Sequence, residues 1–382
     1  MNKDKIFKEI ELNNKQIEKK HKLIDEWSIP RDRKQFYLTN DFHPYFAAYP
    51  PIIVKKIIDK YGNKKKPGTL LDPFMGGGST IVEGYMNGYD CIGSDISEFS
   101  TFITSAKVTP VKINNDDCVN VLNKIKKNLI KKKQKIKLPN ITNINKWFRE
   151  DKIIELVIIK DVINSIENKN KRNFFLLALS SILRSCSNAK NAQQHLNIQK
   201  DKKLPDTISL FEKKIFLMKN QMDKYFEFVK IKKIKNKVKL LSTDIRELKS
   251  KIKDNSIDLV ITSPPYGTGS RYTDIYRLHF EFFDLEKPKF KSSLEKNKDF
   301  NEELKKGFEN VYKILKKNSY FICVYGDPST EESITDIAIK NCREIGFKFE
   351  GLISCPIEKK IFKHHTSYIR FIPKDFILVF KK

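Results

Sequence analysis

A glycine cluster in the first quarter of the chain follows a short apolar segment and precedes a predicted helix. The segment reads LLDPFMGGGST, residues 70–80. Glycine permits positive φ and a close approach of the backbone to a ligand, and the amides at a helix N-terminus attract anionic groups. Asp95 follows a second apolar segment about 20 residues further on, where a carboxylate can accept both hydroxyls of a ribose. These residues predict a nucleotide-type site at the ends of two neighbouring strands.

The residue order in this cluster bears on which nucleotide would bind. A dinucleotide site carries the pattern Gly-x-Gly-x-x-Gly and places a pyrophosphate on the helix. Here Asp72 precedes the glycines, in the order Asp-Pro-Phe-x-Gly-x-Gly. A carboxylate repels a pyrophosphate and attracts an ammonium or sulfonium group. The pattern therefore favours S-adenosylmethionine over a nicotinamide dinucleotide.

A second candidate site is the proline corner TSPPY, residues 262–266, which ends an apolar segment. Proline fixes φ and has no N–H, so the carbonyl before it points outward and stays available. A rigid acceptor beside a serine can hold an exocyclic amino group, and a tyrosine ring can stack on a base swung out of a duplex. Alone, the segment could be a turn that merely ends a strand. Together with the glycine cluster it favours a catalytic site.

Strands and helices alternate on both sides of these motifs, which predicts an α/β fold with a doubly wound sheet. The predicted strands are residues 69–71, 90–93, 237–241, 256–261, 320–324, 346–353 and 376–380, and the predicted helices are residues 6–27, 52–61, 81–87, 301–315 and 333–345. Lysine and isoleucine at helical spacing predict further helices at residues 147–166 and 173–185. We therefore predict an N-terminal helical extension (1–40), a catalytic domain (41–111 and 236–382) and a helical insertion (112–235) that contains a target-recognition region.

The composition is consistent with a nucleic-acid partner. Lysine and arginine number 74 against 47 acidic residues, a net charge of +27, and such a field attracts polyanions. An AT-rich genome also enriches lysine, so charge alone does not decide. No apolar segment reaches the ~20 residues of a membrane span, and the six cysteines show neither CxxC spacing nor a cluster with histidine. We expect a cytoplasmic protein with reduced thiols and no metal.

The combination of DPFMGGGST (72–80) and TSPPY (262–266) resembles the amino-methyltransferases of DNA, the family that forms N4-methylcytosine or N6-methyladenine. The resemblance covers residues 41–110 and 236–382. It implies a Rossmann-like methyltransferase sheet that ends in a reversed hairpin, S-adenosyl-L-methionine as cofactor and double-stranded DNA as partner. The methyl group would pass directly to the exocyclic amino group of a flipped base, so no cysteine nucleophile is expected.

The resemblance also implies a role for individual residues. The catalytic corner would be Ser263, Pro264, Pro265 and Tyr266. The cofactor-binding set would be Tyr45, Phe46, Asp72, Pro73, Phe74, Gly76, Gly78, Ser79, Thr80, Asp95, Ile96, Thr243, Asp244, Ile245 and Ser263. Within that set, the glycines would contact the methionine moiety, Asp95 the ribose and Thr243-Asp244 the adenine, while the segment HPYF (43–46) would close over the methionine end.

Several basic or aromatic residues outside these motifs are candidates for contact with DNA. They are Arg271 and Tyr272 in the loop after the corner, Arg184 and Lys190 after an apolar helix, and Lys363 in a basic patch near the C-terminus. Each has a structural alternative: a packing loop, a helix cap or a solvated hairpin tip.

The target base and the biological setting leave alternatives open. Serine before the prolines is more frequent in cytosine-N4 members, so we favour cytosine N4 over adenine N6. A methyltransferase for guanine N2 of transfer RNA shares both motifs but usually has aspartate before the prolines and an N-terminal RNA-binding domain. A non-catalytic nucleic-acid-binding subunit would show eroded motifs. A restriction–modification or defence system is expected, with cleavage by a separately encoded endonuclease, because no PD-(D/E)xK motif stands out.

Overall fold

The computed structural model describes residues 3–29, 36–46, 48–130, 136–191, 196–265, 272–288, 294, 299–327, 333–356 and 374–382, with backbone alone at residues 3–7 and 272. Its centre is an eight-stranded sheet in the order β1-β7-β8-β6-β5-β2-β3-β4. The strands are β1 Leu23–Glu26, β2 Thr69–Asp72, β3 Asp90–Asp95, β4 Val238–Ser242, β5 Ile257–Thr262, β6 Leu315–Gly326, β7 Lys348–Pro356 and β8 Lys374–Lys381. All neighbours are parallel except β8, which runs antiparallel to β6 and β7. The predicted fold class, with its reversed strand, is confirmed.

The strand order reverses between β2 and β5. The chain moves from β2 outward to β3 and β4, and from β5 outward in the other direction to β6. The two strands are hydrogen-bonded neighbours, with Leu70 opposite Leu259 and Leu71 opposite Val260. At such a reversal the loops that follow the two strands diverge and leave a crevice at the carboxyl edge of the sheet. The glycine cluster follows β2 and the proline corner follows β5, so the topology brings both motifs to one crevice.

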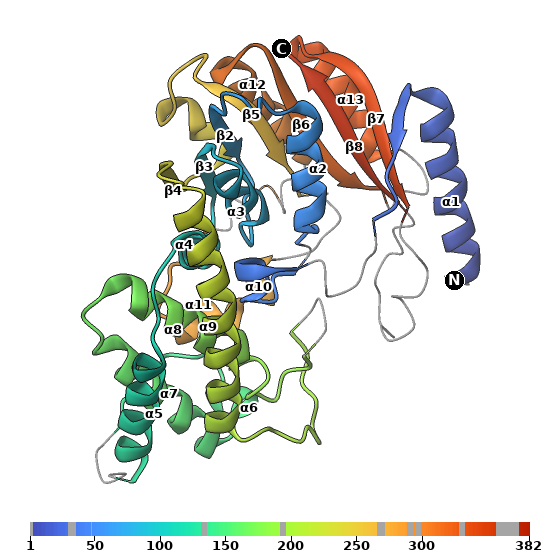
Figure 1. Ribbon diagram of the computed structural model, residues 1–382. Coiled ribbons are helices and arrows are strands. Elements are labelled where there is room, and N and C mark those ends of the chain that lie inside the picture. The colour runs from blue at the N-terminus through green and yellow to red at the C-terminus, as the bar shows by residue number, and fades with distance from the viewer. Residues whose placement is uncertain are drawn as a thin grey trace.

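Helices cover both faces of the sheet, as Figure 1 shows. The helices α2 (Pro51–Tyr61), α3 (Ser79–Met86) and α4 (Glu98–Val108) lie on one face, and α12 (Phe300–Ile314) and α13 (Ile334–Ile345) with the short helix η3 (Ile245–Ser250) lie on the other. Successive strand residues point to opposite faces, so Leu70 belongs to one hydrophobic core and Leu71 to the other. Burial on both faces explains why β5 is almost entirely apolar.

The N-terminal region differs from the prediction. A single helix over residues 6–27 is wrong beyond residue 20, because α1 spans Lys3–Lys20 and Leu23–Glu26 forms the edge strand β1. The backbone of β7 determines this change: Leu352 N donates to Lys22 O at 2.9 Å, and Trp27 N donates to Ser354 O at 2.8 Å. These tertiary hydrogen bonds replace the helical bonds that local sequence would favour.

The helices between α4 and β4 extend to one side of the sheet, below it in Figure 1. They are α5 (Asn115–Ile130), α6 (Ile144–Trp147), α7 (Glu150–Asn164), α8 (Lys169–Leu183) and α9 (Thr207–Ile231). The helix predicted at 147–166 is confirmed as α7, which begins three residues later, at Glu150, while Trp147 ends the short helix α6. Contacts of α8 with α4, and of α9 with η2 (Leu38–Asp41), join this helical part to the sheet. The division into a catalytic domain and a recognition insertion stays a prediction.

Three general features concern the cysteines, the helices and possible metal ligands. All six cysteines are buried and unpaired. No helix in the described segments combines the length and apolarity that a membrane span requires. Among the same segments, no group of three or more His, Cys, Asp or Glu side chains could hold a metal ion.

Candidate cofactor and substrate site

One pocket lies at the carboxyl edge of the sheet and includes both motifs. It encloses about 1020 Å³, counting its open mouth. The predicted residues that line it are Tyr45, Phe46, Pro73, Phe74, Gly76, Ser79, Asp95, Ile96, Thr243, Asp244, Ile245, Ser263 and Pro265. Four other predicted residues, Asp72, Gly78, Thr80 and Pro264, lie outside the lining. The glycine cluster and the proline corner therefore share one cavity, which the catalytic interpretation requires.

Asp72 lies beneath this pocket and joins the two motifs. Its side chain is 1% exposed. Thr262 Oγ1 donates to Asp72 Oδ1 at 2.7 Å, and Phe74 N donates to the same oxygen at 3.0 Å. Burial raises the pKa of Asp72 to about 6, while the hydrogen bonds from Thr262 and Thr80 act in the opposite direction. The carboxylate that precedes the glycines thus fixes the β2 and β5 loops to each other.

The backbone conformation and the lack of space both require glycine in the cluster. Gly76 and Gly78 have φ values of 46° and 82°, in the left-handed region. Gly78 is the N-cap of α3, and a Cβ there would lie 2.6 Å from Thr104 Oγ1. A Cβ on Gly77 would lie 2.7 Å from Tyr45 Cβ. The loop is therefore packed between α4 and Tyr45, and it has no room for side chains.

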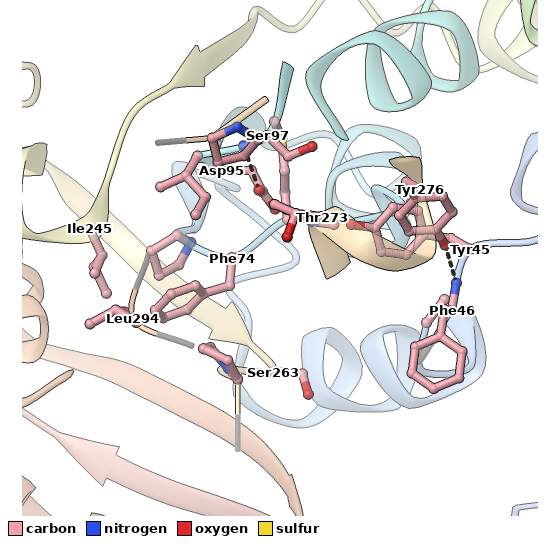
Figure 2. A pocket seen from close by; sticks show the side chains of 18 of the residues that line it. Tyr45, Phe46, Phe74, Asp95, Ser97, Ile245, Ser263, Thr273, Tyr276 and Leu294 are labelled. Carbon is pink, nitrogen blue, oxygen red and sulfur yellow. Dashed lines mark hydrogen bonds between the residues drawn. The ribbon is translucent and has the colours of Figure 1, made fainter. Parts of the chain in front are cut away.

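Asp95 organises the floor of the pocket at the end of β3. Its Oδ2 accepts from Gly76 N at 3.0 Å and its Oδ1 accepts from Ser97 N at 2.9 Å, the bond drawn in Figure 2. Burial raises the pKa of Asp95 to about 6. An ionised carboxylate offers about four lone-pair sites. Asp95 can therefore orient the glycine loop and still accept hydrogen bonds from a ligand.

Asp244 is held in one orientation by Arg246. The guanidinium donates to both carboxylate oxygens of Asp244, from Nε at 2.9 Å and from Nη2 at 2.8 Å. Its Nη1 donates to Glu303 Oε2 at 2.5 Å on α12. The rigid, bidentate geometry of arginine suits this role. The sequence alone did not predict this role for Arg246.

The walls of the pocket are apolar or aromatic. Figure 2 shows Phe74, Ile245 and Leu294 grouped on one side and Tyr45 with Tyr276 on the other. The rings of Tyr45 and Tyr276 stack with centroids 5.0 Å apart at 25°, and Phe46 N donates to the hydroxyl of Tyr276. Tyr276 follows the short helix α10 (Tyr272–Ile275) and precedes α11 (Arg277–Phe282). Its stacking with the predicted Tyr45 was missed, because the two residues are distant in sequence.

Further lining residues were also absent from the sequence prediction. They are Ala48, Tyr49, Met75, Gly77, Ser97, Thr273, Tyr276, Phe280, Pro288 and Leu294. Several adjoin predicted residues in the chain, so extending each motif by one or two positions would have found them. Thr273 and Phe280 belong to the segment after the proline corner, which carried no periodic signal strong enough to place it.

At the proline corner, Ser263 Oγ donates to Val324 O on β6 at 3.0 Å, and Pro265 lines the pocket. Pro264 is buried behind it. Tyr266 and Arg271 lie outside the described residues, as does Lys363, and Tyr272 is described by its backbone alone. The catalytic and DNA-binding roles given to these residues stay predictions.

The remaining candidates for DNA contact have structural partners. Arg184, at the end of α8, donates from Nε to Lys190 O at 2.7 Å. The Lys202 ammonium donates to the carbonyls of Arg184, Ser187 and Ala189 and to Asn191 Oδ1 at 2.7–2.9 Å. These bonds organise the loop after α8, and its contact with DNA stays a prediction. His43 turns away from the pocket and hydrogen-bonds Ser180 Oγ at 3.0 Å in the core.

Comparison with known proteins shows a similarity to DNA methylases. Residues 1–106 match the family model described as DNA methylase. Type II methyltransferase M.MvaI from Kocuria varians is 30% identical over 263 residues, covering 65% of this chain and 58% of the relative. The chain is thus similar to the N6/N4 DNA methylases, through its first 106 residues and through this relative.

The other similarities extend this finding without adding detail to the site. Type II methyltransferase M.BsoBI from Geobacillus stearothermophilus is 24% identical over 273 residues, covering 65% of this chain and 53% of the relative. The chain therefore spans little more than half the length of the two curated relatives that it matches. The solved structure of the putative DNA modification methylase TTHA0409 from Thermus thermophilus, complexed with S-adenosyl-L-methionine, shares 21% identity and covers 36% of this chain and 51% of that one. Its TM-score of 0.24 is too low to support an argument.

Proposed function

We propose that this chain is the catalytic part of an S-adenosylmethionine-dependent DNA methyltransferase that modifies an exocyclic amino group. One observation supports it most: the glycine loop after β2 and the Ser-Pro-Pro corner after β5 line the same pocket. In-line methyl transfer requires the donor and the acceptor to be held within reach of each other. A shared cavity at the switch point of the sheet satisfies that requirement.

The pocket residues fit the proposed cofactor. The carboxylates of Asp95 and Asp244 supply acceptors for hydroxyl and amino groups, and Phe74, Ile96 and Ile245 supply apolar contact for a purine ring. The side-chain-free Gly76 and Gly77 leave room beside Tyr45 for the amino-acid end. The bound cofactor would supply a methyl group activated by its sulfonium. The protein would supply orientation and negative charge around a cationic ligand.

We propose that Ser263 receives the amino group of the target base. Because its hydroxyl hydrogen is directed to Val324 O, its oxygen presents lone pairs to a neighbouring donor. A second acceptor is the carbonyl of Pro264. Hydrogen bonds from the base amino group to these oxygens would favour a pyramidal nitrogen, whose lone pair is less delocalised into the ring. We favour cytosine N4 over adenine N6, because serine occupies the position before the prolines.

The comparisons support DNA as the substrate and a restriction–modification system as the setting. Both curated relatives carry the name Type II methyltransferase. The net charge of +27 suits a polyanionic partner. Within this proposal, a separately encoded endonuclease would recognise the same DNA sequence. The charge and the solubility expected of the chain fit a cytoplasmic enzyme.

A methylation assay with nucleoside analysis tests the proposal. The purified protein would be incubated with S-adenosylmethionine and either a mixed-sequence plasmid or transfer RNA, and the digested product analysed for modified nucleosides. We expect N4-methylcytosine from DNA, nearly abolished by Asp95→Ala and by Tyr266→Ala, and retained in Asp59→Ala, which removes an exposed carboxylate on α2. Methylation of transfer RNA but not of DNA would refute the proposal that DNA is the substrate. N6-methyladenine would reverse the choice of base.

A further inference from the structure

A polar stripe on α4 contacts the wall of the pocket from behind. Ser100, Thr104 and Lys107 are spaced by four and three residues, so they lie on one face of the helix. Ser100 Oγ hydrogen-bonds Tyr45 Oη at 3.0 Å. Thr104 Oγ1 donates to Gly76 O at 3.4 Å, and Lys107 Nζ donates to Gly77 O at 3.0 Å. Each residue of the stripe thus hydrogen-bonds a different residue of the pocket lining.

Lys107 is an unusual member of this stripe, because its side chain is only 2% exposed. Burying an ammonium is costly, and an apolar side chain of similar length would fill the same space. Burial lowers the pKa of Lys107 to about 7. The charged and titratable groups that face it are Lys214 on α9, which disfavours its charge, Asp41 on η2, which favours it, and His43 after η2. The ammonium is therefore poised between its charged and neutral forms near neutral pH.

The orientation of the glycine peptides follows from these bonds. A trans peptide is planar, so its N–H points opposite to the carbonyl of the preceding residue. Because the carbonyl of Gly76 is directed to Thr104 on α4, the N–H of Gly77 points away from α4. The carbonyl of Gly77 is held on the same helix by Lys107. The α4 stripe therefore keeps two carbonyl dipoles out of the pocket and leaves an amide to face a ligand.

We propose that Lys107 is a positioning residue for the cofactor, whose ammonium fixes the Gly76-Gly77 backbone in its ligand-binding orientation. This inference rests on the proposed function, because it assumes that the glycine loop binds S-adenosylmethionine. Lys107 does not line the pocket, and it acts through the Gly77 carbonyl. A charge-assisted hydrogen bond is about twice as strong as a neutral one. The loop should therefore be held more firmly while Lys107 is protonated.

The test compares S-adenosylmethionine binding by calorimetry in the wild type, Lys107→Met and the control Lys152→Met. Lys152 is also nearly buried, at 8% exposure, but it pairs with Glu155 at 2.9 Å on α7. We expect Lys107→Met to weaken binding about fivefold to tenfold at pH 6.5, with Lys152→Met binding as the wild type does. The ratio of the Lys107→Met to the wild-type Kd should fall by pH 9, since Lys107 is then neutral in the wild type and keeps only the weaker, neutral hydrogen bond to Gly77 O. The titration of the ligand amino group cancels in this ratio.

The outcomes separate this inference from the function on which it rests. No binding by the wild type would overturn both. Wild-type binding with an equal Kd for Lys107→Met at pH 6.5 would overturn the role of Lys107 alone. A ratio that stays constant from pH 6.5 to 9 would show a packing effect and would also overturn it. Lys107→Gln, which keeps a polar but neutral side chain, replaces the methionine variant if that variant does not fold, with the same expected ratio.

Discussion

The ionisation of Asp95 should make cofactor binding weaken steeply in mild acid. Burial raises the pKa of Asp95 from 3.8 to about 6 in the free protein. We take the ionised carboxylate as the form that accepts hydrogen bonds from the ligand. Asp95 is then ionised, and the protein able to bind, in about nine tenths of the molecules at pH 7 and in about one tenth at pH 5. The observed Kd for S-adenosylmethionine should therefore rise about tenfold from pH 7 to pH 5.

The same shift has a consequence for the free protein. Because the folded-state pKa of Asp95 is raised, the neutral carboxyl is the form that the fold favours. Its contribution to stability is full below the unfolded pKa and is lost as pH rises through about 6. Because the cofactor binds more tightly at pH 7 than at pH 5, its binding should raise the melting temperature more at pH 7.

Two isosteric variants identify the titrating group. Asp95→Asn keeps one acceptor for the loop amides but carries no charge, so its Kd should be weak at pH 7 and nearly constant down to pH 5. Asp72→Asn keeps an acceptor for Thr262 and Phe74 and should preserve the acid dependence. Calorimetric titrations of the three proteins at matched pH values provide the measurement. A flat wild-type profile, or an acid dependence that survives in Asp95→Asn and disappears in Asp72→Asn, would refute the reasoning.

Three further substitutions test the contacts beneath the pocket. Thr262→Val removes the 2.7 Å hydrogen bond to buried Asp72 and should lower the free energy of unfolding by about 1–3 kcal/mol; an unchanged urea midpoint would contradict this. Gly77→Ala places a Cβ 2.7 Å from Tyr45 Cβ, and the displacement should cost about 1–3 kcal/mol of cofactor affinity; calorimetry that finds wild-type affinity would show that Tyr45 moves freely. Arg246→Ala removes both guanidinium hydrogen bonds to Asp244 and should weaken binding by about 1.5–3 kcal/mol. Arg246→Lys should not restore it, because lysine cannot donate as a planar fork, and full recovery by lysine would mean that charge alone suffices.

The sequence was most informative where chemistry and topology coincide. A glycine cluster after one strand and a Ser-Pro-Pro corner after another can be recognised locally, and the rule for doubly wound sheets predicts where they lie. Asp72 and Thr262 are 190 positions apart, yet each ends a strand at the switch point and they are hydrogen-bonded. The shared pocket could therefore be predicted without coordinates.

The residues that were missed act through tertiary contacts that leave no local pattern. Lys107 looks like an ordinary lysine near the end of a helix, and its burial depends on α9 and η2 packing over it. Tyr276 reaches the pocket by stacking on Tyr45 from a distant part of the chain. The strand β1 forms because β7 offers an open edge. Each depends on a neighbour that is remote in sequence, so periodicity and spacing could not reveal it.

The two buried charged groups that adjoin the glycine loop together predict an optimum for cofactor affinity. Asp95 must be ionised, which requires a pH above about 6, and Lys107 must be protonated, which requires a pH below about 7. Each group bonds the loop from its own side, at Gly76 N and at Gly77 O. Affinity should therefore pass through a maximum between these values and fall on either side.

The single variants should each remove one limb of this profile. In Asp95→Asn the affinity should no longer fall in acid but should still fall in alkali. In Lys107→Met it should still fall in acid but no longer in alkali. The double variant should bind weakly at every pH. Because both groups bond adjacent residues of one loop, their effects should be less than additive in a double-mutant cycle. Strict additivity would mean that the two bonds act on the ligand independently, and that the glycine loop does not move as a unit.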